Sequence, residues 1–364
     1  MTSIVRKGRA VVLEGPNALK LHDLSVSRPE PDAVLARVEF GGVCGSDVHM
    51  TRGEFPLPHA IVLGHEGVGV IEELGSNVVA DYAGVPVSPG DRIYWCPIAP
   101  CHHCWYCTVE KDFSSCTNAT WFGPIEKPTW GSYADYVTLP SDAAFFRIPD
   151  DTPSEAVIAF GCALPAVLQG LERAGGVKPL QSVVVQGCGP IGLSAILIAR
   201  LSGAQSIIAI DGSGLRLDFA RRFGATATLD ISQTTPQERR QAVRELTANR
   251  GADMVIEGTG HHTAFGEGLG LCARNGTYLL IGLWASQGEQ PFDPSFVVQN
   301  NLRIVGTQYA QAHHYHDAMR IAALHHATFP FAELITHRCM LDEAQHALDL
   351  VSSGAAGKVV MCPC

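Results

Sequence analysis

Two short stretches near the N-terminus carry side chains that can bind and use a metal ion. They are residues 41–49, with the sequence GGVCGSDVH, and Gly64-His65-Glu66. A catalytic zinc takes three protein ligands from Cys, His or carboxylate and keeps a fourth position open, so Cys44 and His65 are suitable as two of the three. The alternative is a buried apolar thiol beside packed core histidines. The gathering of so many donors favours half of a catalytic zinc site.

The neighbours of Cys44 suit the remaining tasks of such a site. Asp47 can accept a hydrogen bond from the second ring nitrogen of His65, which fixes the tautomer of that ligand. Ser46 can hold its hydroxyl against an oxygen in the open position, and His49 can pass a proton outward to water. We therefore predict that Ser46, Asp47 and His49 serve the chemistry at the metal.

A third ligand has to come from farther along the chain. Cys162 lies in a Gly-Cys-Ala sequence within residues 155–173, an apolar region expected to form helical segments. Taken by itself, Cys162 would be a core cysteine. Because the N-terminal stretches supply one ligand too few, we predict that Cys162 completes the site.

A second group of thiols predicts a structural zinc. Cys101, Cys104, Cys107 and Cys116 lie within one short segment. Four thiolates can surround zinc with no open position and stabilise a lobe too small to have its own core. A disulfide pair or an iron–sulfur cluster would use the same residues, and spacing alone does not exclude the cluster. No secretory signal follows Met1, which favours metal binding over disulfides and predicts a cytoplasmic protein.

A dinucleotide-binding fingerprint follows in the second half of the chain. Residues 182–186 form an apolar strand that runs into the sequence GCGPIG at 187–192, and residues 193–201 predict a helix. This strand, turn and helix context makes the motif specific. Its glycines allow a tight turn, close approach of a pyrophosphate and close packing of helix on strand, and the helix N-terminus attracts the phosphate charge.

The next strand ends in a residue that selects the cofactor. Residues 206–210 lead into Asp211, and a carboxylate there binds the adenosine ribose hydroxyls and repels a ribose phosphate. We therefore expect NAD rather than NADP, although Arg216 is a nearby cation that can tolerate that phosphate. Later strand ends carry Gly258 and Gly282-Leu283-Trp284, which should border the nicotinamide unless they are ordinary turns. The predicted cofactor-binding residues are Gly187, Gly189, Pro190, Ile191, Gly192, Asp211, Arg216, Gly258, Gly282 and Leu283.

These sites require two kinds of supporting structure. The first 150 residues contain short apolar strands separated by Gly, Pro, Asn and Asp, as in a compact barrel. From residue 182 onward, strands and helices alternate, which predicts a parallel doubly wound sheet with its ligand at the carboxyl ends of the strands. The tail predicts helices at 316–325 and 341–352 and a last strand at 358–361.

Composition limits the class of protein. A chain of 364 residues exceeds the usual size of a single core, which predicts two domains. Hydrophobic residues make up 46% and charged residues 17%, which indicates a globular protein. The net charge of -10 offers no basic face for nucleic acid or anionic lipid. The most apolar region, 182–210, is interrupted by Gly, Pro and Arg and is no membrane span.

Together these motifs resemble the zinc-containing alcohol dehydrogenase group of the medium-chain dehydrogenase/reductase superfamily. The resemblance covers nearly the whole chain and is carried by Cys44-Gly-Ser-Asp-Val-His49, Gly64-His-Glu66, the four-cysteine segment, Gly161-Cys-Ala163, residues 187–192 and Asp211. It implies a GroES-like β-barrel catalytic domain, residues 1–163 and 306–364, which holds both zinc sites. It also implies an inserted Rossmann NAD-binding domain, residues 164–305, and a homodimer or homotetramer.

The resemblance carries roles over to individual residues. Cys44, His65 and Cys162 match the ligands of the catalytic zinc, and Ser46 with His49 match a proton relay. Glu66 matches an acidic residue close to that metal, either a support for its ligands or an alternate ligand. The four cysteines match the ligands of the structural zinc, so two zinc ions and one NAD are expected per chain.

We therefore expect an NAD-dependent zinc alcohol dehydrogenase that transfers hydride between an alcohol and NAD and gives an aldehyde or ketone. Trp121, Phe122, Trp130 and Trp284 are candidates for an apolar pocket, and ordinary packing would explain them equally well. If they line a pocket, they favour an apolar alcohol over a polyol. Alternatives are a sorbitol-like polyol dehydrogenase, a zinc-independent reductase of activated double bonds, and a non-catalytic NAD-binding protein.

Overall fold

The chain divides into two compact units in the computed structural model, which describes residues 4–55, 57, 59–125, 130–282 and 288–363. The first unit is Met1–Cys162 with Ala310–Cys364, and the second is Ala163–Tyr309. The sequence prediction placed its domain boundaries at 163/164 and 305/306, and which function each part carries remains a prediction here. Each unit is described by itself.

The first unit is built mainly from two sheets, in which neighbouring strands are mostly antiparallel. The described residues give a smaller sheet of order β2-β1-β4 and a larger one of order β15-β16-β3-β5-β6-β8, with β7 paired to β3. Their bounds are β1 Ile4–Leu13, β2 Leu19–Ser27, β3 Val34–Val43, β4 Ile61–Val62, β5 Glu66–Leu74, β6 Arg92–Trp95, β7 Tyr136–Leu139, β8 Phe145–Arg147, β15 Ile335–Cys339 and β16 Lys358–Met361.

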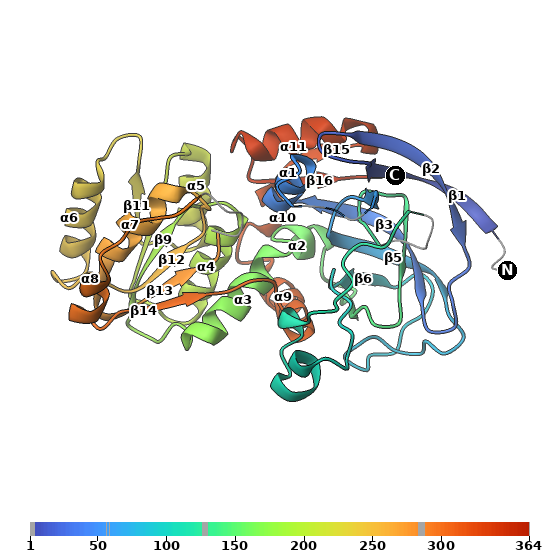
Figure 1. Ribbon diagram of the computed structural model, residues 1–364, viewed down its shortest axis with the longest axis horizontal. Coiled ribbons are helices and arrows are strands. Elements are labelled where there is room, and N and C mark those ends of the chain that lie inside the picture. The colour runs from blue at the N-terminus through green and yellow to red at the C-terminus, as the bar shows by residue number, and fades with distance from the viewer. Residues whose placement is uncertain (1–3, 56, 58, 126–129, 283–287, 364) are drawn as a thin grey trace. The chain divides into compact units, whose positions relative to one another are not determined.

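The tail of the chain completes the sheet begun by the N-terminal strands. β16 pairs antiparallel with β3, with Val359 opposite Val43 and Met361 opposite Gly41, and Figure 1 shows it beside that strand. The contact places the last strand next to the segment that leads to Cys44. The helices of this unit are α1 Gly45–Thr51, α2 Ser154–Ile158, α9 Ala312–His325, α10 Phe331–Leu334 and α11 Ala344–Ser352, with short turns at Tyr106–Glu110, Phe113–Ser115 and Leu341–Glu343.

Apolar side chains from distant segments form the core under the metal-binding segments. One cluster joins β1, the segment before β5, α1 and α11, and includes Val11, Leu63, Val48, Tyr133 and Leu348. All of them are under 9% exposed. A second cluster lies among β3, β5, β6 and β7. The two sheets and their cores agree with the GroES-like fold expected for this part of the chain.

The second unit contains a parallel sheet, as predicted. Within the described residues its strands run in the order β11-β10-β9-β12-β13-β14, all parallel, which is the doubly wound order of dinucleotide-binding folds. All five residues of β9, Ser-Val-Val-Val-Gln, are buried, and its three central valines are typical of a parallel strand covered on both faces. The Rossmann fold is confirmed.

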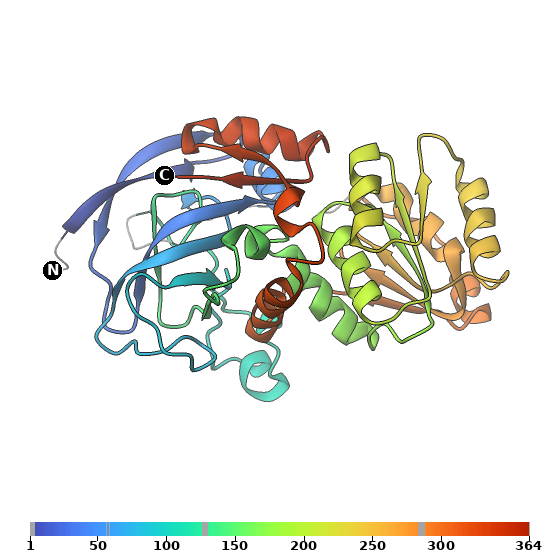
Figure 2. The ribbon, with the colours of Figure 1, turned by 180° about the vertical axis from the view of Figure 1, so that it is seen from behind.

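Helices flank both faces of this sheet (Figures 1 and 2). The helix α4 contacts both α3 and α5, and α6 contacts α7. The bounds are α3 Ala163–Ala174, β9 Ser182–Gln186, α4 Pro190–Leu201, β10 Ser206–Asp211, α5 Gly214–Phe223, β11 Ala227–Asp230, α6 Pro236–Leu246, β12 Ala252–Glu257, α7 His262–Leu271, β13 Cys272–Leu280, α8 Pro294–Gln299 and β14 Arg303–Gly306. In the part of the chain that the structure describes, no helix combines the length and the apolar character needed to cross a membrane.

Candidate metal centres and dinucleotide site

The structure brings the predicted catalytic ligands together. One donor atom each from Cys44, His65, Glu66 and Cys162 lies within 4.8 Å of the others. Cys44 is the N-cap of α1 where β3 ends, His65 directly precedes β5, and Cys162 directly precedes α3. The antiparallel pairing of β3 with β5 brings the first two together, since Gly42 lies opposite Glu66.

Asp47 supports two of these ligands with its two carboxylate oxygens. Its Oδ1 lies 2.9 Å from Nδ1 of His65, so the other ring nitrogen, Nε2, is left for the metal. Its Oδ2 accepts the backbone N–H of Cys44 at 2.9 Å. Asp47 is fully buried, and this is the contact with His65 that the sequence predicted.

The sulfurs of Cys44 and Cys162 lie close together, and the hydrogen bond between them shifts their pKa values in opposite directions. The two sulfurs are 3.7 Å apart. The hydrogen bond from Cys162 is the main cause that lowers the pKa of Cys44 well below its ordinary value, and His65 contributes in the same direction. Burial lowers the pKa of His65, but the charge of Asp47 and hydrogen bonds to Asp47 and Cys44 outweigh it and raise that pKa. Metal binding at this site therefore releases protons.

Glu66 is fixed by two polar contacts and by close packing against two glycines. Its Oε1 accepts the backbone N–H of Cys162 at 2.9 Å, and its Oε2 pairs with the ammonium of Lys358, both side chains being 1% exposed. An added Cβ at Gly42 or Gly161 would collide with the Glu66 carboxylate, and Gly161 also has φ +50°. The carboxylate thus links β5, the loop before α3 and the last strand, β16.

Ser46 and His49, the predicted proton relay, both lie on α1. The hydroxyl of Ser46 is 3.2 Å from the sulfur of Cys44, which places it beside the donor atoms. His49 is partly exposed, and its Nδ1 lies 2.6 Å from Oε2 of Glu54. The ring of Phe55 packs edge-on against the imidazole. One histidine nitrogen is therefore engaged by a carboxylate that the sequence analysis had not singled out.

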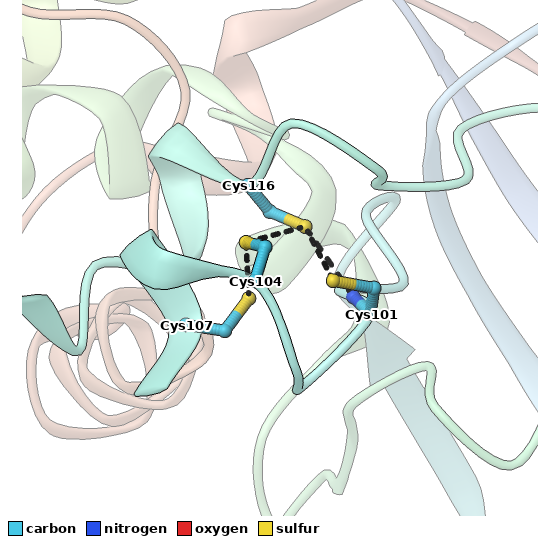
Figure 3. A group of neighbouring side chains, drawn as sticks. All are labelled: Cys101, Cys104, Cys107 and Cys116. Atoms are coloured by element: carbon cyan, nitrogen blue, oxygen red, sulfur yellow. Dashed lines mark hydrogen bonds between the residues drawn. The ribbon is translucent and has the colours of Figure 1, made fainter. Parts of the chain in front are cut away.

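The four cysteines of the second predicted zinc site also converge, as Figure 3 shows. The sulfur distances are 3.5 Å for Cys104–Cys107, 3.8 Å for Cys104–Cys116 and 3.5 Å for Cys101–Cys116. The backbone N–H of Cys107 lowers the pKa of Cys104 to about 6, while burial raises that of Cys107 to about 12. The segment around them is a single helical turn followed by a short 3₁₀ turn.

Sulfur spacing provides a test of whether zinc fits both sites. Tetrahedral ligands about 2.3 Å from zinc lie roughly 3.8 Å from each other. The distances between neighbouring sulfurs in the two sites are 3.5 to 3.8 Å. Two thiolates, an imidazole and a carboxylate in one site, and four thiolates in the other, are also donor sets that zinc prefers. Both sites fit zinc.

The three glycines of the fingerprint have different surroundings. Gly187 has φ +83° and directly follows β9, and an added Cβ would lie 2.7 Å from Cγ2 of Thr259. A Cβ on Gly192 would collide with the carbonyl of Gly187. An added Cβ on Gly189, the N-cap of α4, would have Nη1 of Arg216 as its nearest atom, at 4.0 Å. Of the three, the middle glycine therefore faces open space, where a phosphate can approach the backbone.

Asp211 lies at the carboxyl end of β10, next to this loop. Its Oδ2 accepts the N–H of Cys188 at 2.6 Å and its Oδ1 accepts the N–H of Ser213 at 2.8 Å. The carboxylate is thus held between the glycine loop and the start of α5. Arg216 on α5 brings its guanidinium toward the same loop.

The ends of β12 and β13 meet this loop through glycines and one buried acid. Gly258 donates its N–H to Gln186 O at 2.9 Å, and Gly282 donates to Glu257 O at 3.0 Å. Oε1 of the fully buried Glu257 accepts the backbone N–H groups of Thr259 at 2.7 Å and Gly260 at 2.9 Å. Gly258 and Gly282 thus flank the fingerprint, while Leu283 and Trp284 lie outside the described residues.

Comparisons with known proteins agree with these sites. Residues 30–150 match the alcohol dehydrogenase GroES-like domain and residues 190–323 match the zinc-binding dehydrogenase domain. A 5-exo-hydroxycamphor dehydrogenase of Pseudomonas putida is 48% identical over 354 residues, covering 97% of this chain and 98% of that protein. The chain belongs to the zinc-containing alcohol dehydrogenase family.

Solved structures of the family have the same fold. An alcohol dehydrogenase from Thermotoga maritima is 32% identical, with a TM-score of 0.91 over 98% of this chain and 100% of that one. A zinc-binding dehydrogenase from Sinorhizobium meliloti, bound to NADP, is 27% identical, with a TM-score of 0.87 over 99% of this chain and 100% of that one. As a member of the family, this chain is a zinc-dependent NAD(P) alcohol dehydrogenase.

The alcohol dehydrogenase sites contain residues that the sequence analysis missed. Lys358, Tyr133 and Glu257 are all buried beside predicted site residues, and Glu54 contacts His49. The sequence did contain a signal for Lys358, because this single lysine begins an otherwise apolar strand. A lysine is almost never buried unless it is paired, so such a position suggests a buried partner. For the others the local sequence held no comparable signal.

The aromatic residues predicted to line a pocket differ in their burial and packing. Trp130 is 6% exposed and its Nε1 donates to Pro97 O at 3.2 Å, so it is a packed core residue. Phe122 is partly buried and packs, together with Phe55 and Leu57, against the cluster that contains Val48. Trp121 is also partly buried.

Proposed function

We propose that this alcohol dehydrogenase oxidises an apolar secondary alcohol to a ketone and uses NAD as the hydride acceptor. The observation that carries the proposal is the convergence of Cys44, His65 and Cys162, with Ser46 beside them. Zinc held by these three ligands would act as a Lewis acid on the substrate oxygen. The cofactor would be held by residues 187–192 and Asp211, with Gly258 and Gly282 at the nicotinamide end.

The chain's own residues provide a route for the proton. Ser46 Oγ, next to the donor atoms, would accept the hydroxyl proton of the substrate as it gives up its own proton, and His49 would release a proton to water. When Nδ1 of His49 donates to Glu54, Nε2 is free to accept a proton. Glu54 thereby orients the ring that ends the relay.

Two observations support an apolar substrate. The relative with 48% identity is named for 5-exo-hydroxycamphor, a compact ring alcohol. Near α1 the chain presents the partly buried apolar side chains of Phe55, Leu57 and Phe122, which suit such a ring better than a row of hydroxyl groups. These residues are our candidates for the substrate pocket.

The preference for NAD rests on Asp211. Its carboxylate is fixed by two backbone N–H groups at the end of β10, the position from which a carboxylate bonds the ribose hydroxyls of NAD. A 2′-phosphate at that position would face this negative charge. Arg216 is the feature that opposes the preference, because its guanidinium lies near the same loop.

A substrate panel tests the proposal. We expect the highest kcat/KM for 5-exo-hydroxycamphor or another bicyclic secondary alcohol such as borneol, lower values for cyclohexanol, and the lowest for ethanol, sorbitol and erythritol. With the best substrate, NAD should be preferred over NADP, and Asp211→Ala should reduce that preference. A polyol as the best substrate would overturn the substrate class, and an NADP preference in the wild type would overturn the cofactor assignment.

Following the family resemblance, we further infer a homodimer or homotetramer located in the cytoplasm. Sedimentation equilibrium of the purified protein distinguishes either oligomer from a monomer, and a monomer at micromolar concentration would contradict the inference.

A further inference from the structure

A buried tyrosine donates a hydrogen bond to the carboxylate that supports the catalytic ligands. The hydroxyl of Tyr133 lies 2.9 Å from Oδ2 of Asp47, and both side chains are 0% exposed. Burial and the charge of Asp47 raise the pKa of Tyr133 well above its ordinary value, so the hydroxyl keeps its proton and acts as a donor. A buried bond to a charged acceptor is stronger than one between neutral groups.

Backbone contacts fix the position of that hydroxyl. The N–H of Tyr133 donates to Leu63 O at 3.0 Å, and its carbonyl accepts the N–H of Val11 at 2.8 Å. The ring lies directly over Gly64, where an added Cβ would collide with it. Because the phenol is rigid and both of its backbone groups are bonded, its hydroxyl is a fixed point beside Asp47.

Asp47 connects the Tyr133 hydroxyl to two predicted metal ligands. The oxygen that accepts from Tyr133 also accepts the backbone N–H of Cys44, and the other oxygen contacts the His65 ring. If the carboxylate turned about its terminal torsion, it would lose the alignment of both contacts together. A second fixed donor on Oδ2 opposes that rotation.

We propose that Tyr133 is a positioning residue for the catalytic zinc, which holds Asp47 in the orientation that presents both Cys44 and His65 to the metal. The inference deepens the proposed function and rests on its catalytic zinc site. Packing alone would be served equally well by phenylalanine, because the ring lies in the apolar cluster of Val11 and Leu63. The hydroxyl is therefore the part of the side chain to test.

The test compares Tyr133→Phe with a matched variant, Tyr278→Phe. Tyr278 is also fully buried, and its hydroxyl bonds Gln186 Oε1 and Ala264 O in the other unit, which holds no predicted zinc ligand. Zinc release from the holoenzyme is followed with a chromogenic chelator, and the four-cysteine zinc is the internal reference. We expect Tyr133→Phe to release the catalytic zinc about tenfold faster, within the range seen for outer-shell partners of metal ligands, while Tyr278→Phe behaves like the wild type.

Cobalt substitution adds a spectroscopic measurement, and a double variant tests the route through Asp47. In Tyr133→Phe the visible bands of cobalt at the catalytic site should shift, because the ligand geometry changes. In an Asp47→Asn background the same substitution should have a much smaller effect, since coupled residues are not additive. Unchanged zinc release, an unchanged cobalt spectrum, or an equal effect in the wild-type and Asp47→Asn backgrounds would overturn the proposal. A wild type that binds only one zinc would instead overturn the proposed function.

Discussion

Glu66 contributes one of the donor atoms gathered at the catalytic centre, yet both of its oxygens have partners. Oε1 holds the backbone of Cys162 and Oε2 pairs with Lys358. To reach a metal ion, the carboxylate would have to leave a buried ammonium without a counter-charge, which is costly. The contacts therefore favour Glu66 as a support for Cys162. The predicted zinc ligands are then Cys44, His65 and Cys162.

The Lys358–Glu66 pair predicts an asymmetric response to mutation. Lys358→Met leaves the Glu66 carboxylate buried and unpaired, so it should destabilise the protein by about 3–5 kcal/mol. Adding Glu66→Gln removes the second charge and keeps an oxygen for the Cys162 N–H, so the double variant should recover part of that loss. Urea unfolding of the holoenzyme measures both. A double variant less stable than Lys358→Met would contradict the pairing.

Cys44 offers a direct test of the catalytic zinc. Cys44→Ala should lower the zinc content from two ions per chain to one and reduce alcohol oxidation by at least about a thousandfold, because the Lewis acid supplies several kcal/mol. The control is Cys96→Ala, which removes another thiol, 3% exposed, whose pKa burial raises to about 12. That variant should keep both zinc ions. Metal analysis and steady-state NADH formation give the answer, and normal turnover of Cys44→Ala would exclude the assignment.

Sequence reasoning found the donors that have a chemical signature and missed those that act through the fold. Cys44, His65 and Asp47 lie in short stretches with a distinctive composition. Lys358 reaches Glu66 only because β16 pairs with β3, across 292 positions of the chain. Tyr133 reaches Asp47 through the backbone contacts of residues 63 and 11. Such pairs depend on strand register between distant segments, which local sequence does not contain.

At the scale of elements, the alternation of strand and helix was predictable because it is local. β9, the glycine loop and α4 follow one another without interruption, and β10 ends at the predicted Asp211. The loop after β12 is held by the carboxylate of Glu257, which accepts two of its backbone N–H groups. Nothing in the sequence around Glu257 distinguishes a loop anchor from a solvated acid, so its role emerged only from the folded chain.

The glycine loop predicts that two similar substitutions have different effects. Gly192→Ala places a Cβ against the carbonyl of Gly187 and should cost about 1–3 kcal/mol of stability, as overpacking does. Gly189→Ala meets no atom nearer than 4.0 Å, so the free protein should be nearly as stable as the wild type. Its Cβ would occupy the approach of the pyrophosphate, so NADH affinity should fall at least about tenfold, or 1.4 kcal/mol.

Two measurements separate these outcomes. Thermal unfolding without cofactor should single out Gly192→Ala, and fluorescence titration with NADH should single out Gly189→Ala. If Gly189→Ala bound NADH as tightly as the wild type, the phosphate would not lie over this loop, and the assignment of residues 187–192 to the cofactor would fail.

At the scale of the whole molecule, the predicted zinc ligands and the predicted cofactor-binding residues lie in different units. All predicted zinc ligands lie in Met1–Cys162, whose unit also includes Ala310–Cys364, and the described cofactor residues lie in Ala163–Tyr309. The last strand, β16, is part of the sheet that carries the zinc ligands. The tail therefore helps to build the metal centre through this pairing and through Lys358, although it contributes no predicted ligand.

This distribution predicts which parts of the chain respond to each ligand. A ligand that binds only the folded state stabilises it by about 2.7 kcal/mol at one hundred times its Kd, and amide hydrogen exchange locates that effect. Removal of zinc with a chelator should speed exchange first in residues 96–120, around the four cysteines, and in β3, α1, β5 and β16. Addition of NADH should instead slow exchange in residues 186–192, 211–213 and 257–260. Equal changes throughout the chain in either experiment would show that the ligand acts on global unfolding, and changes confined to the opposite unit would contradict the assignment of the sites.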